Sequence, residues 1–302
     1  MRAPRRGGSP LGPGGTARRT WSLPGRGPRR MALLLLALLL PALAALEGQE
    51  FFRGRGWRNR PLREGLPTRA GIVDRGFTFC RLFYRSARRE PSGSGWRTDY
   101  PMSDMNFTTR IEQLTAVRSA RWEDGEPGFA VVSATDPQLF ECPFLFASDV
   151  GTAEFTAEEV ERLREYLLKG GFLWADDFWG ERAWRYWEAE IRRVLPDHEI
   201  IEIGVEHNML HALYRVSEIP QIPNIRFWQR SGGAVSERGA ESAVPDLRGI
   251  FDEDGRLLVL MTHDTDIADG WEREGEDKGF FDAFSPDAYA FGINVVVWAM
   301  TR

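Results

Sequence analysis

The sequence lacks the motifs that mark several common enzyme classes. It has no P-loop, no Gly-x-Gly-x-x-Gly turn, no Gly-x-Ser-x-Gly elbow and no Cys-x-x-Cys pair. The first two motifs hold phosphates and dinucleotides against backbone amides, and the third presents an activated serine. Phosphate and dinucleotide binding therefore have no support in this chain.

Cysteine is also scarce, since only Cys80 and Cys142 occur. Each lies in or beside an apolar, strand-like run, and we expect two buried structural thiols. Export would make a bridge between them chemically permitted, but the spacing of two cysteines does not predict one.

Acidic residues are missing from residues 1–44, which hold eight of the 39 basic residues. The rest of the chain carries 31 basic and 44 acidic residues, which gives it a net charge of −13. Binding to nucleic acid requires a basic face for the phosphates. The acidic body therefore argues against nucleic acid as a partner.

The N-terminal apolar run is short for a membrane span, which needs about 20 residues. Residues 1–28 are rich in Arg, Gly and Pro and are predicted to be disordered. Arg29 and Arg30 then precede an apolar run over 31–46 that contains Ala-Leu-Ala before Ala45. This pattern predicts a signal peptide, cleaved near Ala44, and an exported protein that is periplasmic or extracellular. The alternative is a retained N-terminal membrane anchor.

The composition divides the chain into three segments. Residues 1–46 form the basic N-terminus with its signal peptide or anchor, and residues 47–75 form an Arg- and Gly-rich linker. Residues 76–302 are predicted to be a single α/β domain.

The most informative stretch of that domain runs from Gly170 to Gly180. It has the pattern of a helix end, a short buried strand and an abrupt loop with two adjacent carboxylates. Before it, Thr156 and Glu159 have the spacing of a capping box. After it, a helix with a tryptophan-rich apolar stripe begins near Gly180. Helix, strand, acidic loop and helix in this order are typical of a doubly wound, mostly parallel sheet.

The rest of the domain fits the same fold class. Expected strands lie at 77–84, 129–133, 144–147 and 198–203, and an expected helix with Asp104 as N-cap covers roughly 104–118. Near the C-terminus, two apolar runs flank an Asp-Glu-Asp-Gly turn and predict a β-hairpin. Ser285-Pro286 predicts the start of a last helix, apolar nearly all round and therefore buried.

The first candidate site is Asp176 and Asp177 with Trp179. Adjacent carboxylates point in different directions, so at most one of the two is expected to face a given ligand. The pair could bind a metal or a sugar hydroxyl, with tryptophan as a stacking surface. It could equally cap the next helix, and both interpretations stay open.

The second candidate is His207 with His211. On a helix, a spacing of four places both imidazoles on one face, as a metal site requires. The order of residues is not the His-Glu-x-x-His of zinc proteases, and further ligands are not identified. The alternative is two histidines that form hydrogen bonds under a loop.

The third candidate is Asp264, Asp266 and Asp269, followed by Trp271. Alternating acids at a strand end can ligate a hard cation, although the run does not match a calcium-binding hand. A solvated acidic loop is the alternative. All three candidates follow predicted strands, so they would converge if those strand ends lie at one edge of the sheet.

These residues together resemble the bacterial domain of unknown function 4159 family. The resemblance covers roughly 76–301 and rests on Gly170–Gly180, the His207/His211 segment, Asp269-Gly270-Trp271-Glu272 and Tyr289-Ala290-Phe291-Gly292-Ile293-Asn294. It implies a fold like that of the class I glutamine amidotransferases, akin also to the trehalose-utilisation-like proteins. It implies no established activity.

The amidotransferase chemistry itself does not carry over. That superfamily uses a cysteine nucleophile on a tight turn after a central strand, whereas the corresponding turn here offers Asp176 and Asp177. Neither Cys80 nor Cys142 is followed by the small residues and helix start that would activate a thiolate.

We therefore expect non-catalytic binding at the acidic and aromatic strand ends, with a small molecule, a glycan or an envelope protein as partner. The alternative is a metal-assisted hydrolase that acts on cell-envelope carbohydrate. In that hypothesis Asp176 or Asp177 holds a divalent metal with His207 and His211, and Asp264 or Asp266 acts as ligand or base. A third interpretation is purely structural, because the eleven tryptophans could simply fill the core.

Overall fold

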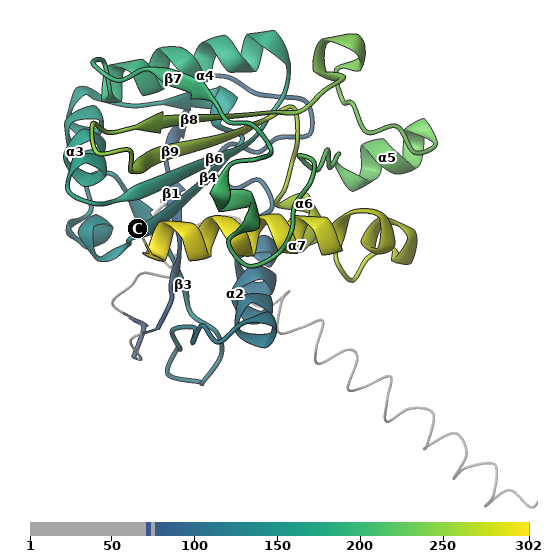
Figure 1. The fold of residues 1–302 in the computed structure, drawn as a ribbon, viewed down its shortest axis with the longest axis horizontal. Coiled ribbons are helices and arrows are strands. Elements are labelled where there is room, and N and C mark those ends of the chain that lie inside the picture. The colour runs from purple at the N-terminus through teal and green to yellow at the C-terminus, as the bar shows by residue number, and fades with distance from the viewer. Residues whose placement is uncertain (1–70, 74–75, 302) are drawn as a thin grey trace, which may run out of the picture. The chain divides into compact units, whose positions relative to one another are not determined.

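The computed structural model describes residues 71–73 and 76–301 (Figure 1). The predicted signal peptide and most of the predicted linker lie outside these residues. The described elements, in chain order, are β1 (Phe79–Phe83), β2 (Arg85–Ser86), α2 (Met102–Leu114), β3 (Phe129–Ser133), η3 (Pro137–Glu141), β4 (Phe144–Ser148), η4 (Val150–Thr152), β5 (Ala153–Glu154), α3 (Ala157–Leu168), β6 (Phe172–Phe178), α4 (Gly180–Val194), β7 (Ile200–Glu202), η5 (Asn208–His211), α5 (Ile225–Ser231), η6 (Gly239–Ser242), β8 (Asp246–Phe251), β9 (Leu257–His263), α6 (Asp269–Glu272) and α7 (Lys278–Thr301).

The described part of the chain is built on a seven-stranded sheet in the order β3-β1-β4-β6-β9-β8-β7. The first five strands in this order are parallel, and β8 is antiparallel to both of its neighbours. The predicted mostly parallel α/β class is therefore confirmed. The predicted hairpin, β8 and β9, is part of the main sheet, because β9 also pairs with β6.

The central strands of the sheet are buried on both faces, as β6 illustrates. Leu173 and Ala175 belong to the core under α3 and α4, whereas Phe172 and Trp174 belong to the core under α2 and α7 (Figure 1). Apolar side chains on both faces are the usual pattern of a parallel sheet covered by helices.

The direction in which the chain crosses the sheet reverses between β1 and β4. From β1 the chain passes through α2 to β3 on one side, and from β4 it passes through α3 to β6 on the other. The helices cover opposite faces, since Phe107 of α2 and Leu163 of α3 lie in different cores. Open α/β sheets bind ligands at such a reversal, outside the carboxyl ends of the strands.

The predicted boundaries of α3 are confirmed. Thr156 and Glu159 form the reciprocal hydrogen bonds of a capping box at its start. At its end, the amide of Gly171 donates to Tyr166 O and the amide of Gly170 donates to Leu167 O. Gly170 has a φ of 111°, which a residue with a side chain rarely adopts. This glycine therefore ends the helix and turns the chain into β6.

The last helix begins earlier than predicted. α7 starts at Lys278, and Pro286 lies inside it. Asp277 Oδ1 accepts hydrogen bonds from the amides of Gly279 and Phe280, whereas Ser285 Oγ donates to Gly270 O. The serine that resembled an N-cap therefore fastens α7 to α6.

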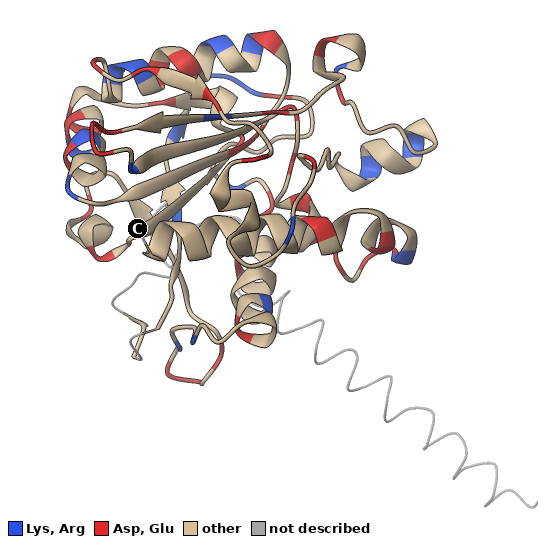
Figure 2. Cartoon of the chain, viewed as in Figure 1, with Lys and Arg blue, Asp and Glu red and all other residues tan. Residues whose placement is uncertain are grey.

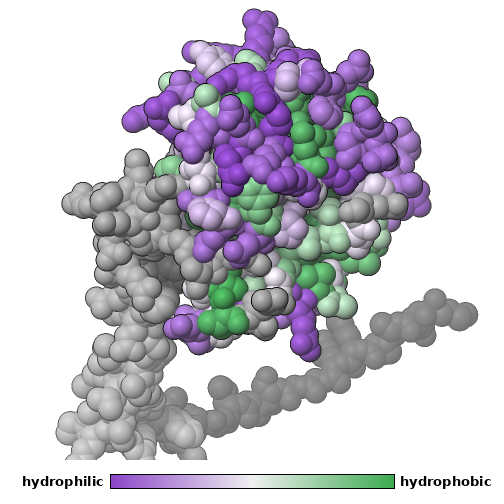
Figure 3. Space-filling view, turned by 90° about the vertical axis from the view of Figure 1, so that its left-hand side faces the viewer, coloured by the Kyte–Doolittle hydropathy of each residue, from purple (hydrophilic) through white to green (hydrophobic). Residues whose placement is uncertain are grey.

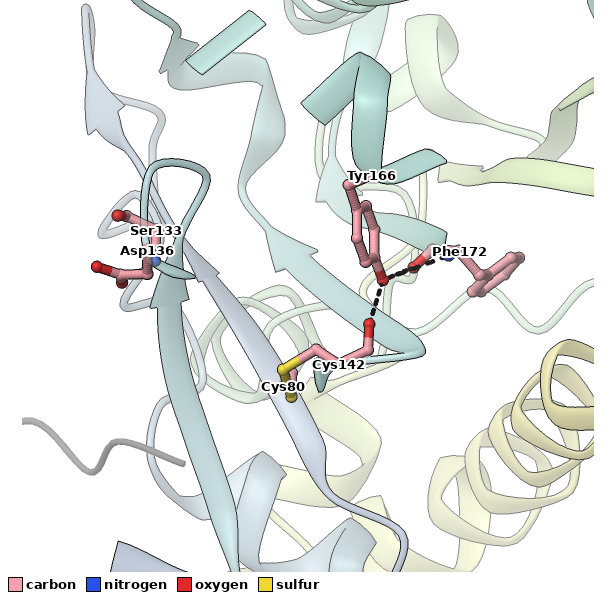
Figure 4. The surroundings of a disulfide bond; sticks show 6 residues. All are labelled: Cys80, Ser133, Asp136, Cys142, Tyr166 and Phe172. Atoms are coloured by element: carbon pink, nitrogen blue, oxygen red, sulfur yellow. Dashed lines mark hydrogen bonds between the residues drawn. A yellow bond between two sulfur atoms is a disulfide. The ribbon is translucent and has the colours of Figure 1, made fainter. Parts of the chain in front are cut away.

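Cys80 and Cys142 form a disulfide, so the expectation of two free thiols is wrong (Figure 4). Cys80 lies in β1 and Cys142 lies just before β4, and their Cα atoms are 6.0 Å apart. The Tyr166 hydroxyl donates to Cys142 O and lies 3.1 Å from Phe172 O, which connects the bridge to α3 and β6. The spacing could not show the bridge because the lateral pairing of β1 with β4 creates it.

The edge where the strands begin carries a small apolar pocket of about 300 Å³, lined by Phe77, Pro143, Val296 and Met300 among others. Figure 3 shows the molecule from this side, where hydrophilic side chains predominate and apolar ones form small patches. Within the described ranges no helix has the length and apolar character needed to cross a membrane.

Removal of the disulfide is expected to destabilise the protein. The bridge closes a loop with a sequence separation of 62 residues. In the chain-entropy description, such a loop contributes about 4 kcal/mol to the free energy of unfolding. The double variant Cys80→Ala/Cys142→Ala should therefore unfold at a clearly lower denaturant concentration than the oxidised protein. A reducing agent should lower the midpoint of the natural protein and leave that of the double variant unchanged. Equal midpoints for the two proteins in the absence of reductant would contradict the prediction.

Candidate functional site

Acidic residues lie at the carboxyl ends of the central strands, beside α6 (Figure 2). One oxygen from each of Asp99, Asp177 and Asp266 lies within 4.8 Å of the others, and the same holds for Asp99, Asp269 and Glu272. We call these five residues the carboxylate cluster. Asp99 belongs to both groups of three and follows β1, so the cluster lies close to the reversal between β1 and β4.

Arg81 holds the loop that carries Asp99. Its guanidinium, fully buried in β1, pairs with Asp104 of α2 and also donates to Ser103 Oγ and to the carbonyl oxygens of Trp96 and Thr98. These bonds use all five donors of the side chain. Arg81 therefore positions Asp99 without forming an ion pair with it, and the predicted N-cap role of Asp104 is wrong because α2 already begins at Met102.

Asp177 lies in β6. The sequence predicted it in a loop after the strand, and that prediction is wrong. The pairing of β6 with β9 is irregular between Ala175 and Phe178, and Asp177 has a φ of 54°. Trp179 Nε1 donates to Asp177 Oδ1 over 3.1 Å and so fixes the orientation of the carboxylate. Trp179 is itself buried, so it supports Asp177 and offers little surface for stacking.

Asp176 points away from Asp177, as expected for adjacent residues of a strand. Its oxygens accept hydrogen bonds from Thr262 Oγ1 and from the amide of Ala268, the latter at 3.1 Å. Asp176 therefore ties β6 to β9 and to the start of α6. Neither Asp176 nor Asp177 caps α4, so the interpretation of this pair as the cap of the next helix is wrong.

The cap of α4 comes from Asp264. Its Oδ1 accepts a hydrogen bond from the amide of Gly180 over 2.6 Å. His263 lies beside it, with Nδ1 3.0 Å from Asp246 Oδ2 and Nε2 3.3 Å from Gly180 O. Asp246, His263 and Asp264 form a second group of potential metal ligands. Both ring nitrogens of His263 already face protein acceptors, so neither is directed at a metal site. We therefore assign this group a structural role, in which it links β8, β9 and α4.

Backbone strain is concentrated at the same edge. Five described residues other than glycine have positive φ, and four of them are aspartates: Asp99, Asp149, Asp177 and Asp264. Aspartate tolerates the left-handed region better than most residues, but the conformation still costs about 1 kcal/mol or more. Four such residues lie at one edge of the sheet, which makes that edge the candidate for a functional site.

Burial and mutual repulsion make these carboxyl groups weak acids. Loss of hydration is the main cause, and neighbouring carboxylates add to it, so the pKa is raised well above the usual range in Asp99, Asp177, Asp266 and Asp269. Burial also raises the pKa of Asp149 and of Asp176 to about 7.

The cluster is poorly neutralised by protein cations. Arg273 contacts Glu272 and Asp269, with Nε–O distances of 2.7 and 3.4 Å. Among the residues that the structure describes, Asp99, Asp177 and Asp266 take part in no ion pair. Buried charge is normally paired or bound to a metal. Protons or an external cation must therefore balance these three carboxylates.

His207 and His211 lie elsewhere. The segment is a short 3-10 helix that His207 precedes, and His207 Nδ1 accepts a hydrogen bond from the amide of Met209, so the argument from a shared helix face does not apply. The His207 ring packs against Phe251 and Trp298. Phe251 pairs with Leu257 at the opposite end of β9 from Asp264. The structure therefore does not bring the histidine pair to the carboxylate cluster.

Trp271 belongs to the core. It is fully buried, and its ring contacts Phe107, Phe146 and Trp174. A Cβ atom added at Gly292 would lie 2.4 Å from its Cζ2, so the ring also fixes the approach of α7. For this tryptophan the purely structural interpretation is the better one.

Of the predicted site residues, Asp177, Asp266 and Asp269 come together, and sequence reasoning missed Asp99 and Glu272. Asp99 precedes Tyr100-Pro101 in an irregular loop that has no repeated spacing. Its position after a predicted strand was the one available signal. Glu272 directly follows Trp271, and only the fold shows that it turns toward Asp99.

A family model described as a domain of unknown function (DUF4159) matches residues 78–300, which is most of the chain. A search of curated proteins finds no match.

The raised pKa values predict that stability falls as pH rises. The folded state holds protons that the unfolded chain releases above its ordinary pKa of 3.8, so folding is favoured at low pH and loses this contribution as pH passes through the raised values. In a chelating buffer the melting temperature at pH 5.5 should exceed that at pH 8 by about 4 °C or more, because 1 kcal/mol moves it by about 2–4 °C at this size. Other charged groups also face the cluster, namely Arg81, Arg273 and Glu237. They do not change the direction in which stability depends on pH.

The matched variants are Asp266→Asn in the cluster and Asp254→Asn in the exposed hairpin turn. An asparagine side chain cannot titrate, so the slope of melting temperature against pH should flatten in the first variant and persist in the second. A melting temperature that rises from pH 5.5 to pH 8 would contradict the raised pKa values of the buried carboxyl groups.

Proposed function

The chain belongs to the DUF4159 family, and we propose that its carboxylate cluster binds a positively charged ligand, a divalent metal ion in the first instance. One observation carries this proposal: Asp99, Asp177 and Asp266 place oxygens within 4.8 Å of one another, almost fully buried and with no ion pair in the described part of the chain. A cation in their midst would remove the repulsion that burial makes costly.

The donor set favours a hard cation. All five members of the cluster are carboxylates, which suit Mg²⁺, Ca²⁺ and Mn²⁺ better than they suit zinc. An ion held by carboxylates commonly keeps exchangeable waters. Oxygens of a glycan, a small molecule or an envelope protein could replace these waters, which gives the three expected partner classes a common way to bind.

Binding is favoured over catalysis as the function. The hydrolase hypothesis drawn from the sequence needs His207 and His211 beside the acids, whereas His207 lies at the other end of β9 and His211 closes the short 3-10 helix that follows His207. The carboxylates alone support the holding of an ion. We therefore place the metal-assisted hydrolase second.

We further propose that the fold is related to that of the class I glutamine amidotransferases and the trehalose-utilisation-like proteins. The mostly parallel sheet supports this, and so does Asp177, whose positive φ lies at the strand-to-helix turn where that superfamily has its cysteine. The absence of cysteine from this turn agrees with a binding role.

Cation binding is tested on the purified protein, without a histidine tag and after dialysis against a chelator. Calorimetric titration with Mg²⁺, Ca²⁺ and Mn²⁺ should show near-stoichiometric uptake of at least one ion. In Asp177→Asn and Asp266→Asn, uptake should weaken by about tenfold or more, a loss of about 1.4 kcal/mol. Asp254→Asn should bind like the natural protein.

The variant His207→Ala separates the two metal hypotheses. It should leave uptake unchanged if the carboxylate cluster is the site. Uptake that is lost in this variant and kept in Asp177→Asn would refute the cluster and restore the histidine pair.

We also propose that the protein is exported, since the Cys80–Cys142 bridge suits an oxidising compartment and the apolar run at 31–46 fits a signal peptide. Thiol trapping in cells provides the test. The full chain should show no reactive thiol after denaturation, and a chain that lacks residues 1–46 should show two. Equal labelling of both chains would contradict export.

A further inference from the structure

Four of the five members of the carboxylate cluster are almost closed to solvent, whereas the side chain of Glu272 is 12% exposed and pairs with Arg273. The exposed fraction is 6% for Asp99, 8% for Asp177, 2% for Asp266 and zero for Asp269. A hydrated cation can therefore reach the carboxylates only if part of the surrounding chain moves. The identity of the moving part, inferred below, rests on the proposed cation binding.

Residues 220–242, which include α5 and η6, lie against the connection between β9 and α6, which carries Asp266, and against Asp269 of α6; we call them the covering segment. The amide of Asp266 donates to Ile222 O over 2.9 Å, and the amide of Ile222 donates to Thr265 Oγ1 over 3.0 Å. The amide of Ile225, the first residue of α5, donates to Asp269 Oδ2 over 2.8 Å. A cluster carboxylate therefore holds the first amide of α5, while the side chain of Asn224 caps the next two.

The covering segment also brings a further acid toward the cluster. Glu237 has a side chain that is only 3% exposed, and its negative charge acts on Asp177. Its Oε1 accepts a hydrogen bond from the amide of Asn224, and its Oε2 lies 3.2 Å from Arg238 Nη1. With the cluster ionised and empty, repulsion between Glu237 and Asp177 favours opening; a bound cation reverses that balance.

The attachment of the covering segment is slight compared with that of the sheet. Within it, Ile222, Pro223 and Ile225 are buried, Trp228 packs against Phe280 and Phe284 of α7, and residues 229–234 are exposed. Gly232, Gly233 and Gly239 have positive φ and can absorb changes of backbone angle. Few buried apolar contacts and many polar ones are the properties of segments that open at low free-energy cost.

We propose that residues 220–242 form a lid, which opens to admit the cation to the carboxylate cluster and which the bound cation then holds closed.

Limited trypsin digestion of the purified protein measures the opening. Arg230 lies exposed in the last turn of α5, and cleavage there requires the helix to unfold locally. In chelator, cleavage at Arg230 should be readily detected by mass spectrometry. With saturating Mg²⁺ or Mn²⁺ it should slow by about tenfold or more, which corresponds to about 1.4 kcal/mol of added protection.

Arg118 serves as the control site, since it lies exposed in the irregular connection after α2, outside the covering segment, and its cleavage requires no helix to unfold. Its cleavage should not depend on the cation, which corrects for any effect of the metal on trypsin. In Asp177→Asn, the cation should lose its protective effect at Arg230. In Glu237→Gln, cleavage in chelator should slow because the repulsion between residue 237 and Asp177 is removed. Faster cleavage would contradict a role of this repulsion in opening.

The failures of the two proposals can be told apart. If calorimetry shows cation binding but cleavage at Arg230 is the same with and without the ion, the lid is wrong and the cation site stands. If calorimetry shows no binding, the cation site and the lid both fall.

Discussion

Arg81 is a buried cation in the middle of β1, and the whole carboxyl edge of the sheet depends on how it is satisfied. Its five donors are shared between Asp104 of α2 and the loop that ends at Thr98. An unpaired guanidinium at this depth would cost several kcal/mol, so the loop and the helix are held where those acceptors are needed. The loop in turn places Asp99 opposite Ser148, at the end of β4.

The main electrostatic feature of this edge is repulsion between buried carboxylates. Asp99, Asp177, Asp266, Asp269 and Glu272 converge from three connections of the sheet, and Arg273 balances only part of their charge. Strained aspartate backbones and carboxyl groups of raised pKa occur together there. A fold that needed only stability would replace such groups with apolar ones of similar size, which often stabilises a protein. This cost is what motivates the proposal that the cluster binds a cation.

Local rules succeeded where the determining contacts are close in sequence. The capping box at Thr156 and the glycine stop at Gly170 gave the limits of α3, and a short apolar run after that glycine gave the buried strand β6. The same rules failed at Ser285, whose hydroxyl bonds to α6, and at Asp104, whose carboxylate bonds to Arg81. In both cases a partner distant in sequence took the side chain that the local pattern assigned to a cap.

The sequence by itself determined the α/β class, most strand and helix positions, and the fact that acidic residues follow the strands, because hydrophobic periodicity and capping are local properties. The tertiary structure decided which of those acids meet. It joined Cys80 to Cys142 through the pairing of β1 with β4, and it separated His207 from the cluster by the length of β9. It also added Asp99 from an irregular loop. Contacts of this kind depend on the order of strands in the sheet, and no spacing within a single chain segment encodes that order.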